Sequence, residues 1–203
     1  MAEPTTTIRI GPNDHGRRMD FLDFRDAEVS PGYRYELARG VVHVTQIPGG
    51  SHAAVLGAIH RKLSRYWDDH LDPIELVAGG ASCRLEAPEM MSERHPDCAV
   101  YVSPRPTIEP PWADWVPEIV VEVVSKGGED RDYSEKRADY LAVGIQEYWI
   151  IDPDRRTMLV LTRRGDTWAE HTLDSDAVYR CRLLPGFELP LAEVFRPLGP
   201  RTD

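Results

Sequence analysis

The chain has 203 residues, enough for one domain with a hydrophobic core and too few for two comfortable ones. It carries 34 Asp and Glu against 24 Lys and Arg, and this net charge of −10 argues against passive, non-specific binding of nucleic acid, which depends on neutralising phosphates. No apolar stretch approaches the ~20 residues that span a bilayer. The first residues also lack a signal-peptide pattern, so we expect a cytoplasmic protein.

The first third of the chain predicts an arm, a hairpin and a long helix. Residues 1–17 are polar without periodicity and predict a flexible N-terminal arm, ahead of a single domain over residues 18–197. The periodicity then predicts a short helix over 19–29, a hairpin of strands over 33–37 and 41–47, and a helix from Ser51, as its cap, to about residue 70. Two short strands are expected near 74–78 and 82–86.

The middle of the chain predicts buried strands separated by an irregular loop. Residues 98–102 and 119–124 are continuous apolar runs, typical of strands that are buried on both faces. The loop over 103–117 holds five prolines together with Trp112 and Trp115. This composition indicates either a contact surface for a second subunit or for substrate, or a loop that packs onto its own domain.

The last third predicts one more helix and several strands. A helix over 133–143 has Asp132 as a candidate cap and Gly144 as a stop, and a strand over 147–151 follows it. Strands over 158–162 and 168–173 form a hairpin, and a short strand over 187–189 precedes a terminal turn. The order of elements predicts an α/β (α+β) fold, with a mixed central sheet flanked by helices. The three scattered cysteines argue against a disulfide framework and a zinc knuckle.

Glu122 is the acid that the sequence commits most strongly to the interior. It lies within a run of valines, and the alternation of a strand places it on one face with Val120 and Val124. Burying a lone carboxylate costs several kcal/mol, so a compensating cation or a set of hydrogen bonds is expected.

Asp97 and Lys136 are the candidate partners of Glu122. Asp97 follows Pro96 at the start of the first apolar run, and if the two strands are neighbours both carboxylates can reach one ion. Lys136 shares a helix face with Asp132 and Tyr140. Two carboxylates and a lysine suit a divalent metal site for phosphodiester hydrolysis. The alternative is a structural ion pair of Glu122 with Lys136, with Asp97 merely capping a strand.

A series of short motifs in order along the chain resembles a known family. The motifs are Tyr35-Glu36-Leu37 with Gly40, Pro96-Asp97, residues 121–125, the set Asp132, Lys136 and Tyr140, and residues 147–153. Over about residues 19–196, this series resembles the Uma-type restriction endonuclease family of the PD-(D/E)xK nuclease superfamily. The resemblance implies a restriction-endonuclease-like core and a Mg²⁺-dependent site, with Mn²⁺ as a second possible metal.

The resemblance also implies roles for individual residues. Asp97 and Glu122 match the metal ligands, and Lys136 matches the catalytic lysine, which the wider superfamily carries at the position of Val124. Glu36 matches an acid that reaches the metal through water, although it could be a surface strand residue. His52 matches a family histidine and supports the site together with Asp132 and Tyr140, or else is structural.

The chain departs from the family pattern at two places. The family often has a second acid directly after the hairpin glycine, where this chain has Val41, and a Ser-Pro-Ser turn where it has Ser125-Lys126-Gly127. The first loss could weaken metal binding, and the second changes only a loop.

Three functions remain open at this point. The first is a Mg²⁺-dependent DNA endonuclease, the second a catalytically silent binding or regulatory protein with a nuclease fold, and the third a metal-dependent hydrolase of another substrate. Cleavage of duplex DNA needs two sites, so a homodimer through the loop of Trp112 and Trp115 or through the late hairpin is expected. Basic clusters could contact phosphates or be solvated faces: Arg61, Lys62 and Arg65, and the pairs at 155–156 and 163–164.

Overall fold

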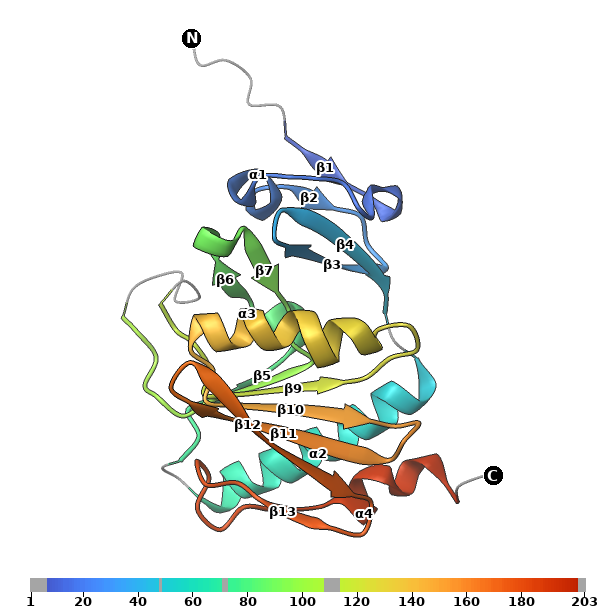
Figure 1. Cartoon of the computed structure of the whole chain (residues 1–203), viewed down its shortest axis with the longest axis vertical. Helices are drawn as coiled ribbons and strands as arrows, with labels where there is room; N and C mark the ends of the chain where they lie inside the picture. Colours follow the sequence, from blue (N-terminus) through green and yellow to red (C-terminus); the bar gives the residue numbers. More distant parts are fainter. Residues whose placement is uncertain (1–6, 48, 71–72, 108–113, 201–203) are drawn as a thin grey trace. The chain divides into compact units, whose positions relative to one another are not determined.

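A computed structural model describes residues 7–47, 49–70, 73–107 and 114–200. The chain forms two compact units (Figure 1). The first holds the described residues up to Ile47 together with Arg84–His95, and the second holds those of Pro48–Cys83 and Pro96–Asp203. Each unit has its own sheet and its own buried cluster of apolar side chains.

The first unit is built on the predicted hairpin. Its sheet has the order β4-β3-β7-β6, with the bounds β3 Tyr33–Ala38, β4 Val41–Gln46, β6 Leu85–Ala87 and β7 Ser92–Arg94. Arg39 and Gly40 join β3 to β4, both with positive φ, as a two-residue hairpin turn requires. The hairpin prediction is therefore confirmed.

The described residues from 7 to 29 form more regular structure than their polar composition predicts. The helix expected over 19–29 is only α1, Phe21–Arg25, which Asp20 caps by accepting a hydrogen bond from the Leu22 N–H. Strand β2, Glu28–Val29, pairs in parallel with β1, Arg9–Ile10. Ile10 is fully buried in the apolar cluster of this unit, and this contact anchors residues that we expected in a loose arm.

The second unit contains a six-stranded mixed sheet, in agreement with the predicted fold class. Its order is β12-β11-β10-β9-β8-β5. The bounds are β5 Leu76–Ala78, β8 Cys98–Tyr101, β9 Ile119–Val123, β10 Glu147–Asp152, β11 Thr157–Arg164 and β12 Thr167–Asp174. Only β9 and β10 run parallel, and every other neighbouring pair is antiparallel.

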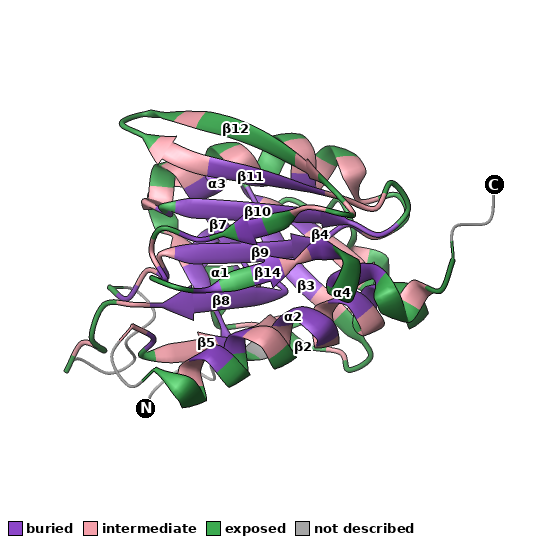
Figure 2. Cartoon of the chain, turned by 90° about the horizontal axis from the view of Figure 1, so that it is seen from below, coloured by how far each residue is buried: buried purple, intermediate pink, exposed green. Residues whose placement is uncertain are grey.

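Helices cover both faces of this sheet (Figure 1). Helix α2, Gly50–Asp69, and helix α4, Leu191–Phe195, pack with Ile119, Val121 and Val123 in one apolar cluster. Helix α3, Lys136–Val143, lies on the opposite face, where Glu122 points. Figure 2 shows β8, β9 and β10 as buried along their length, whereas β12 is largely exposed at the edge of the sheet.

Caps were predicted at the start of α2 and at both ends of α3, and only one of these predictions is correct. Gly49, not Ser51, is the N-cap of α2, because the helix begins at Gly50, two residues earlier than a cap at Ser51 predicts. Asp132 is not a helix cap either: it lies inside a π-helical turn, Arg131–Glu135, that leads directly into α3, and its side chain is buried. Gly144 ends α3 with φ 102°, which confirms the predicted stop.

The remaining elements are short. They are the strands β13 Val178–Arg180 and β14 Glu188–Pro190, and the 3₁₀ turns Pro12–Asp14, Gly80–Ser82, Pro88–Met90 and Arg196–Leu198. Among the described helices, none is long and apolar enough to cross a membrane.

The loop between β8 and β9 packs onto its own unit at Trp115. Trp115 is buried, its indole N–H donates to the Ser103 carbonyl at 3.0 Å, and its ring lies 4.3 Å from that of Tyr101. Trp112 lies outside the described residues. Trp115 is thus a core residue, and the expectation of an exposed contact tryptophan is wrong at this position.

Candidate active site

Asp97 and Glu122 lie opposite each other at the ends of adjacent strands. Cys98 pairs with Val121 in the antiparallel register of β8 and β9, which places Asp97 across from Glu122 one step further along. The Asp97 N–H donates to Glu122 Oε2 at 3.4 Å. Their relative exposures are only 4% and 1%, so two carboxylates share a site largely sealed from solvent.

The Asp97 carboxylate is held by hydrogen-bonding groups from strand β9 and helix α2. Its Oδ2 atom accepts the Val123 N–H at 2.9 Å, and His52 Nε2 lies 2.8 Å from the same oxygen. His52 is in the first turn of α2, so the start of this helix fixes the orientation of the carboxylate. His52 therefore supports Asp97 directly.

The Glu122 carboxylate is bound from helix α3. The Tyr140 hydroxyl donates to Glu122 Oε1 at 2.5 Å, and Lys136 Nζ lies 2.9 Å from the same atom. Lys136 and Tyr140 are four residues apart, so one face of α3 presents both groups to the strand. The predicted helix face thus meets the predicted strand face.

Asp132 completes the cluster from the π-helical turn. Its Oδ1 atom lies 2.9 Å from Lys136 Nζ, and its backbone carbonyl accepts a hydrogen bond from the Tyr148 hydroxyl at 2.9 Å. π-Helical turns are rare and occur frequently at functional sites. Here the turn brings a second carboxylate to the lysine that also contacts Glu122.

Three buried carboxylates, those of Asp97, Glu122 and Asp132, belong to this cluster. Lys136 Nζ contacts Glu122 and Asp132, whereas Asp97 is contacted by His52. Buried charges are costly unless opposite charges or hydrogen bonds compensate them.

The candidate metal ligands are two carboxylates, those of Asp97 and Glu122. In the described part of the chain, no group of three or more His, Cys, Asp or Glu side chains is arranged to hold a metal ion. Mg²⁺ is usually bound through one or two carboxylates, with water and substrate phosphates as its other ligands. The carboxylates of Asp97 and Glu122 fit that pattern.

Sequence reasoning missed Gly79, which makes room for the backbone of Asp97. A Cβ atom added at Gly79 would lie 2.2 Å from the Asp97 carbonyl oxygen, a distance that no real contact reaches. The next residue, Gly80, donates its N–H to the Pro96 carbonyl at 2.8 Å. The Gly79-Gly80 pair in the sequence was the available signal, because glycine often marks a close approach of backbone segments.

Thiol chemistry does not contribute to this site. Burial raises the pKa of the Cys83 thiol to about 12 and also raises that of Cys98, the residue next to Asp97. Because the thiolate is the reactive form, both side chains stay protonated and inert at neutral pH.

Glu36 lies in the first unit, and its carboxylate is engaged there. Its Oε1 atom accepts the His95 N–H at 3.0 Å, and Oε2 lies 3.6 Å from an Arg94 guanidinium nitrogen. Glu36 is buried in β3, so the alternative interpretation of a surface strand residue is wrong. Its predicted contact with a metal through water stays a prediction.

The sequence profile of the Uma2 family, described as "Putative restriction endonuclease", matches residues 20–192. The chain belongs to the Uma2 family. The match covers both units and includes Asp97, Glu122, Lys136, Asp132 and Tyr140. The family predicted from the sequence motifs is therefore confirmed.

A solved structure shares the fold of this Uma2 protein. It is the crystal structure of a protein from Anabaena variabilis ATCC 29413, described as a putative nuclease belonging to DUF820. The match has a TM-score of 0.72 and 18% sequence identity, and it covers 89% of this chain and 99% of the other. No curated protein is similar enough to count as a match.

Proposed function

We propose that this Uma2 protein is a Mg²⁺-dependent endonuclease that hydrolyses phosphodiester bonds in DNA. The observation that carries the proposal is the pair of buried carboxylates, Asp97 and Glu122, opposite each other with Lys136 in contact. The third buried acid, Asp132, and the family match support it.

Each side chain has a role in this proposal. Asp97 and Glu122 would hold Mg²⁺, which supplies Lewis-acid activation of the phosphate and a lowered pKa of bound water. Lys136 stabilises the negative charge that develops on the phosphate. His52 and Tyr140 orient the two carboxylates through the hydrogen bonds that they make to them.

One observation favours a second function, that of a catalytically silent nuclease-fold protein that binds or regulates. Glu122 already contacts both an ammonium group and a hydroxyl, so the chain itself supplies partners for this buried acid. A closed internal network of this kind would stabilise the fold without metal. Metal binding and turnover therefore have to be measured separately.

Cleavage of supercoiled plasmid in Mg²⁺ or Mn²⁺ tests the proposal. We expect nicking by the unchanged protein and none by Asp97→Asn or Glu122→Gln. Glu147→Gln is the matched control, because Glu147 is an equally buried strand carboxylate that contacts Trp149 and Tyr179 instead of the site. Nicking that survives in both site variants would remove these acids from the mechanism. Absence of both nicking and metal binding would favour the silent protein.

We also propose that the active form is a homodimer. Because Trp115 is buried, the exposed strand β12 at the sheet edge is the remaining described candidate for the contact. An edge strand offers unpaired backbone groups to a second copy. Sedimentation equilibrium that shows only a 23.0 kDa species at micromolar concentration would contradict this proposal.

A further inference from the structure

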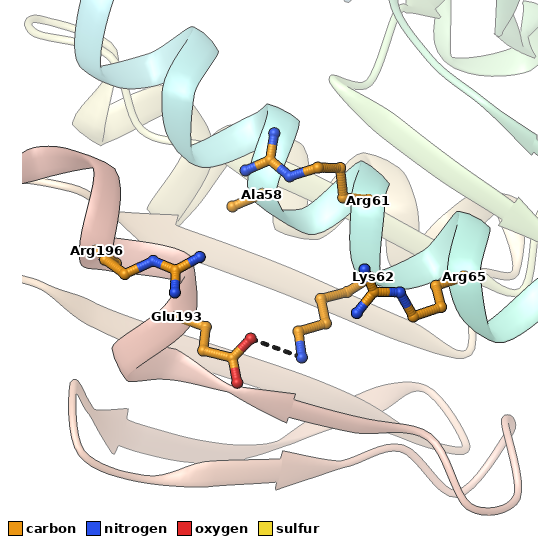
Figure 3. Close-up of a pocket in the computed structure, with 6 residues that line it drawn as sticks. All are labelled: Ala58, Arg61, Lys62, Arg65, Glu193 and Arg196. Carbon is orange, nitrogen blue, oxygen red and sulfur yellow. Dashed lines mark ion pairs between the residues drawn. The ribbon is translucent and has the colours of Figure 1, made fainter.

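A basic pocket lies between helix α2 and the C-terminal helices, away from the candidate active site. It is open to solvent, has a volume of about 90 Å³ and is lined by Ala58, Arg61, Lys62, Arg65, Glu193 and Arg196. Figure 3 shows Lys62 bridging to Glu193 across the two helices, with Arg65 beside Lys62 and Arg196 on the opposite wall. The pocket is thus built by two elements that are far apart in the sequence.

Positive charge dominates this pocket although the whole chain has a net charge of −10. Four cationic side chains and one carboxylate, that of Glu193, line the pocket, and the nearest partner of Glu193 is Lys62 at 2.7 Å. The hydrogen bond from Lys62 lowers the pKa of Glu193, and the charges of Arg196 and Arg65 lower it further. The field inside the pocket therefore favours anions.

No hydrogen bond or ion pair joins the guanidinium groups of Arg61, Arg65 and Arg196 to another described residue. Arg65 and Arg196 interact with Glu193 only through their charge. Arg61 and Arg65 are also like charges four residues apart on one helix, a spacing that destabilises the helix. A bound anion would offset this repulsion.

The chemistry of the lining indicates a phosphate group. Guanidinium groups present paired N–H donors that match the oxygens of phosphate, and their charge persists at any physiological pH. A volume of about 90 Å³ is well below that of sites for whole organic ligands. The pocket therefore fits a single charged group of a larger molecule, or a free ion.

The pocket is separate from the candidate active site but shares helix α2 with it. His52, in the first turn of α2, contacts Asp97, whereas Lys62 lies ten residues further along the same helix. At a rise of 1.5 Å per residue, the two positions are about 15 Å apart along the helix axis. DNA carries one phosphate per about 3.4 Å along each strand, so this spacing corresponds to several nucleotides.

We propose that this pocket binds a backbone phosphate of a nucleic acid, at a distance from the bond that is cleaved. The proposal rests on the proposed function for its choice of nucleic acid over a free phosphate. It makes the pocket a positioning site, because phosphate contacts set register without reading sequence.

Fluorescence anisotropy with a labelled 20-base-pair duplex, in EDTA and low salt, tests the proposal without requiring cleavage. The double variant Arg65→Gln/Arg196→Gln removes two guanidinium groups from the pocket, and we expect it to weaken binding on the order of tenfold. It should also reduce the slope of log K against log salt by about 2. Glu193→Gln should strengthen binding, because it removes the only carboxylate in the lining.

The matched control is Arg18→Gln/Arg182→Gln, which makes the same change of net charge at exposed positions outside the pocket. The proposal would be overturned if the two double variants lost the same amount of affinity for the duplex, or if the unchanged protein did not bind DNA. If inorganic phosphate raises the melting temperature of the unchanged protein but not of the pocket variant, while both bind DNA equally well, the result would overturn the choice of nucleic acid. If the unchanged protein binds DNA through the pocket but does not nick plasmid, the result would count against the proposed function alone.

Discussion

Replacing Lys136 by methionine should destabilise the protein far more than an ordinary lysine substitution. The ammonium group is 5% exposed and lies 2.9 Å from both Glu122 and Asp132, each of which is itself buried. Methionine retains most of the side-chain volume but leaves both carboxylates without their cation. Breaking a buried ion pair from one side costs about 3–5 kcal/mol, because the stranded charge stays desolvated.

The expected loss is measurable against the total stability of a domain. For a chain of this size, each kcal/mol lowers the melting temperature by about 2–4 °C, so Lys136→Met should lower it by about 6–20 °C. Thermal and urea unfolding in EDTA would measure the change. Lys126→Met is the control, because Lys126 is exposed and makes no ion pair with any described residue. We expect that control to change stability by less than about 0.5 kcal/mol.

Addition of Mg²⁺ separates the two interpretations of the cluster. If Asp97 and Glu122 hold a metal ion, saturating Mg²⁺ should restore part of the stability that Lys136→Met loses, by about 2.7 kcal/mol at one hundred times the dissociation constant. If Glu122 is only a member of an internal ion pair, Mg²⁺ should leave the variant unchanged. If Lys136→Met lowers the free energy of unfolding in EDTA by less than about 1 kcal/mol, the reasoning is refuted, because no buried charge was left without a partner.

Three further outcomes are expected. Glu122→Gln should abolish nicking yet cost only about 1–2 kcal/mol of stability, since Lys136 keeps Asp132 as its partner and the Tyr140 hydrogen bond can persist; paired unfolding and plasmid assays measure both. Gly79→Ala should reduce nicking by displacing the Asp97 backbone, whereas Gly57→Ala, inside α2, should stabilise the protein by about 0.5–1 kcal/mol. Thiols with a pKa of about 12, such as Cys83, should resist Ellman's reagent at pH 8 in the folded protein and react after unfolding in guanidinium; reaction of the folded protein should grow only as the pH approaches 12.

Local pattern was enough to predict one side of the site. The alternation of β9 placed Glu122 away from Ile119, Val121 and Val123, and these three residues do lie in the opposite apolar cluster. Helical spacing likewise placed Lys136 on a face that meets Glu122. Both predictions depend on a few consecutive residues, so no knowledge of the sheet order was needed.

Features that depend on distant segments could not be predicted in the same way. The burial of Ile10, the packing of Trp115 on Tyr101 and the approach of Gly79 to Asp97 each join parts of the chain whose pairing no local pattern reveals. The π-helical turn was missed for another reason. Asp132 is a good cap residue by type, and only the ion pair with Lys136 shows why the chain buries it instead.

The contacts of Lys136 give a reason for the displaced lysine. A lysine two residues after Glu122 would replace Val124, just past the end of β9, whereas here the lysine comes from α3. From α3 one ammonium group contacts Glu122 and Asp132 together. Asp97 has other partners, His52 and the Val123 N–H. The displaced lysine therefore links the strand acid Glu122 to the acid of the π-helical turn, a link that ties α3 to the strand whose carboxylate is proposed to hold the divalent cation.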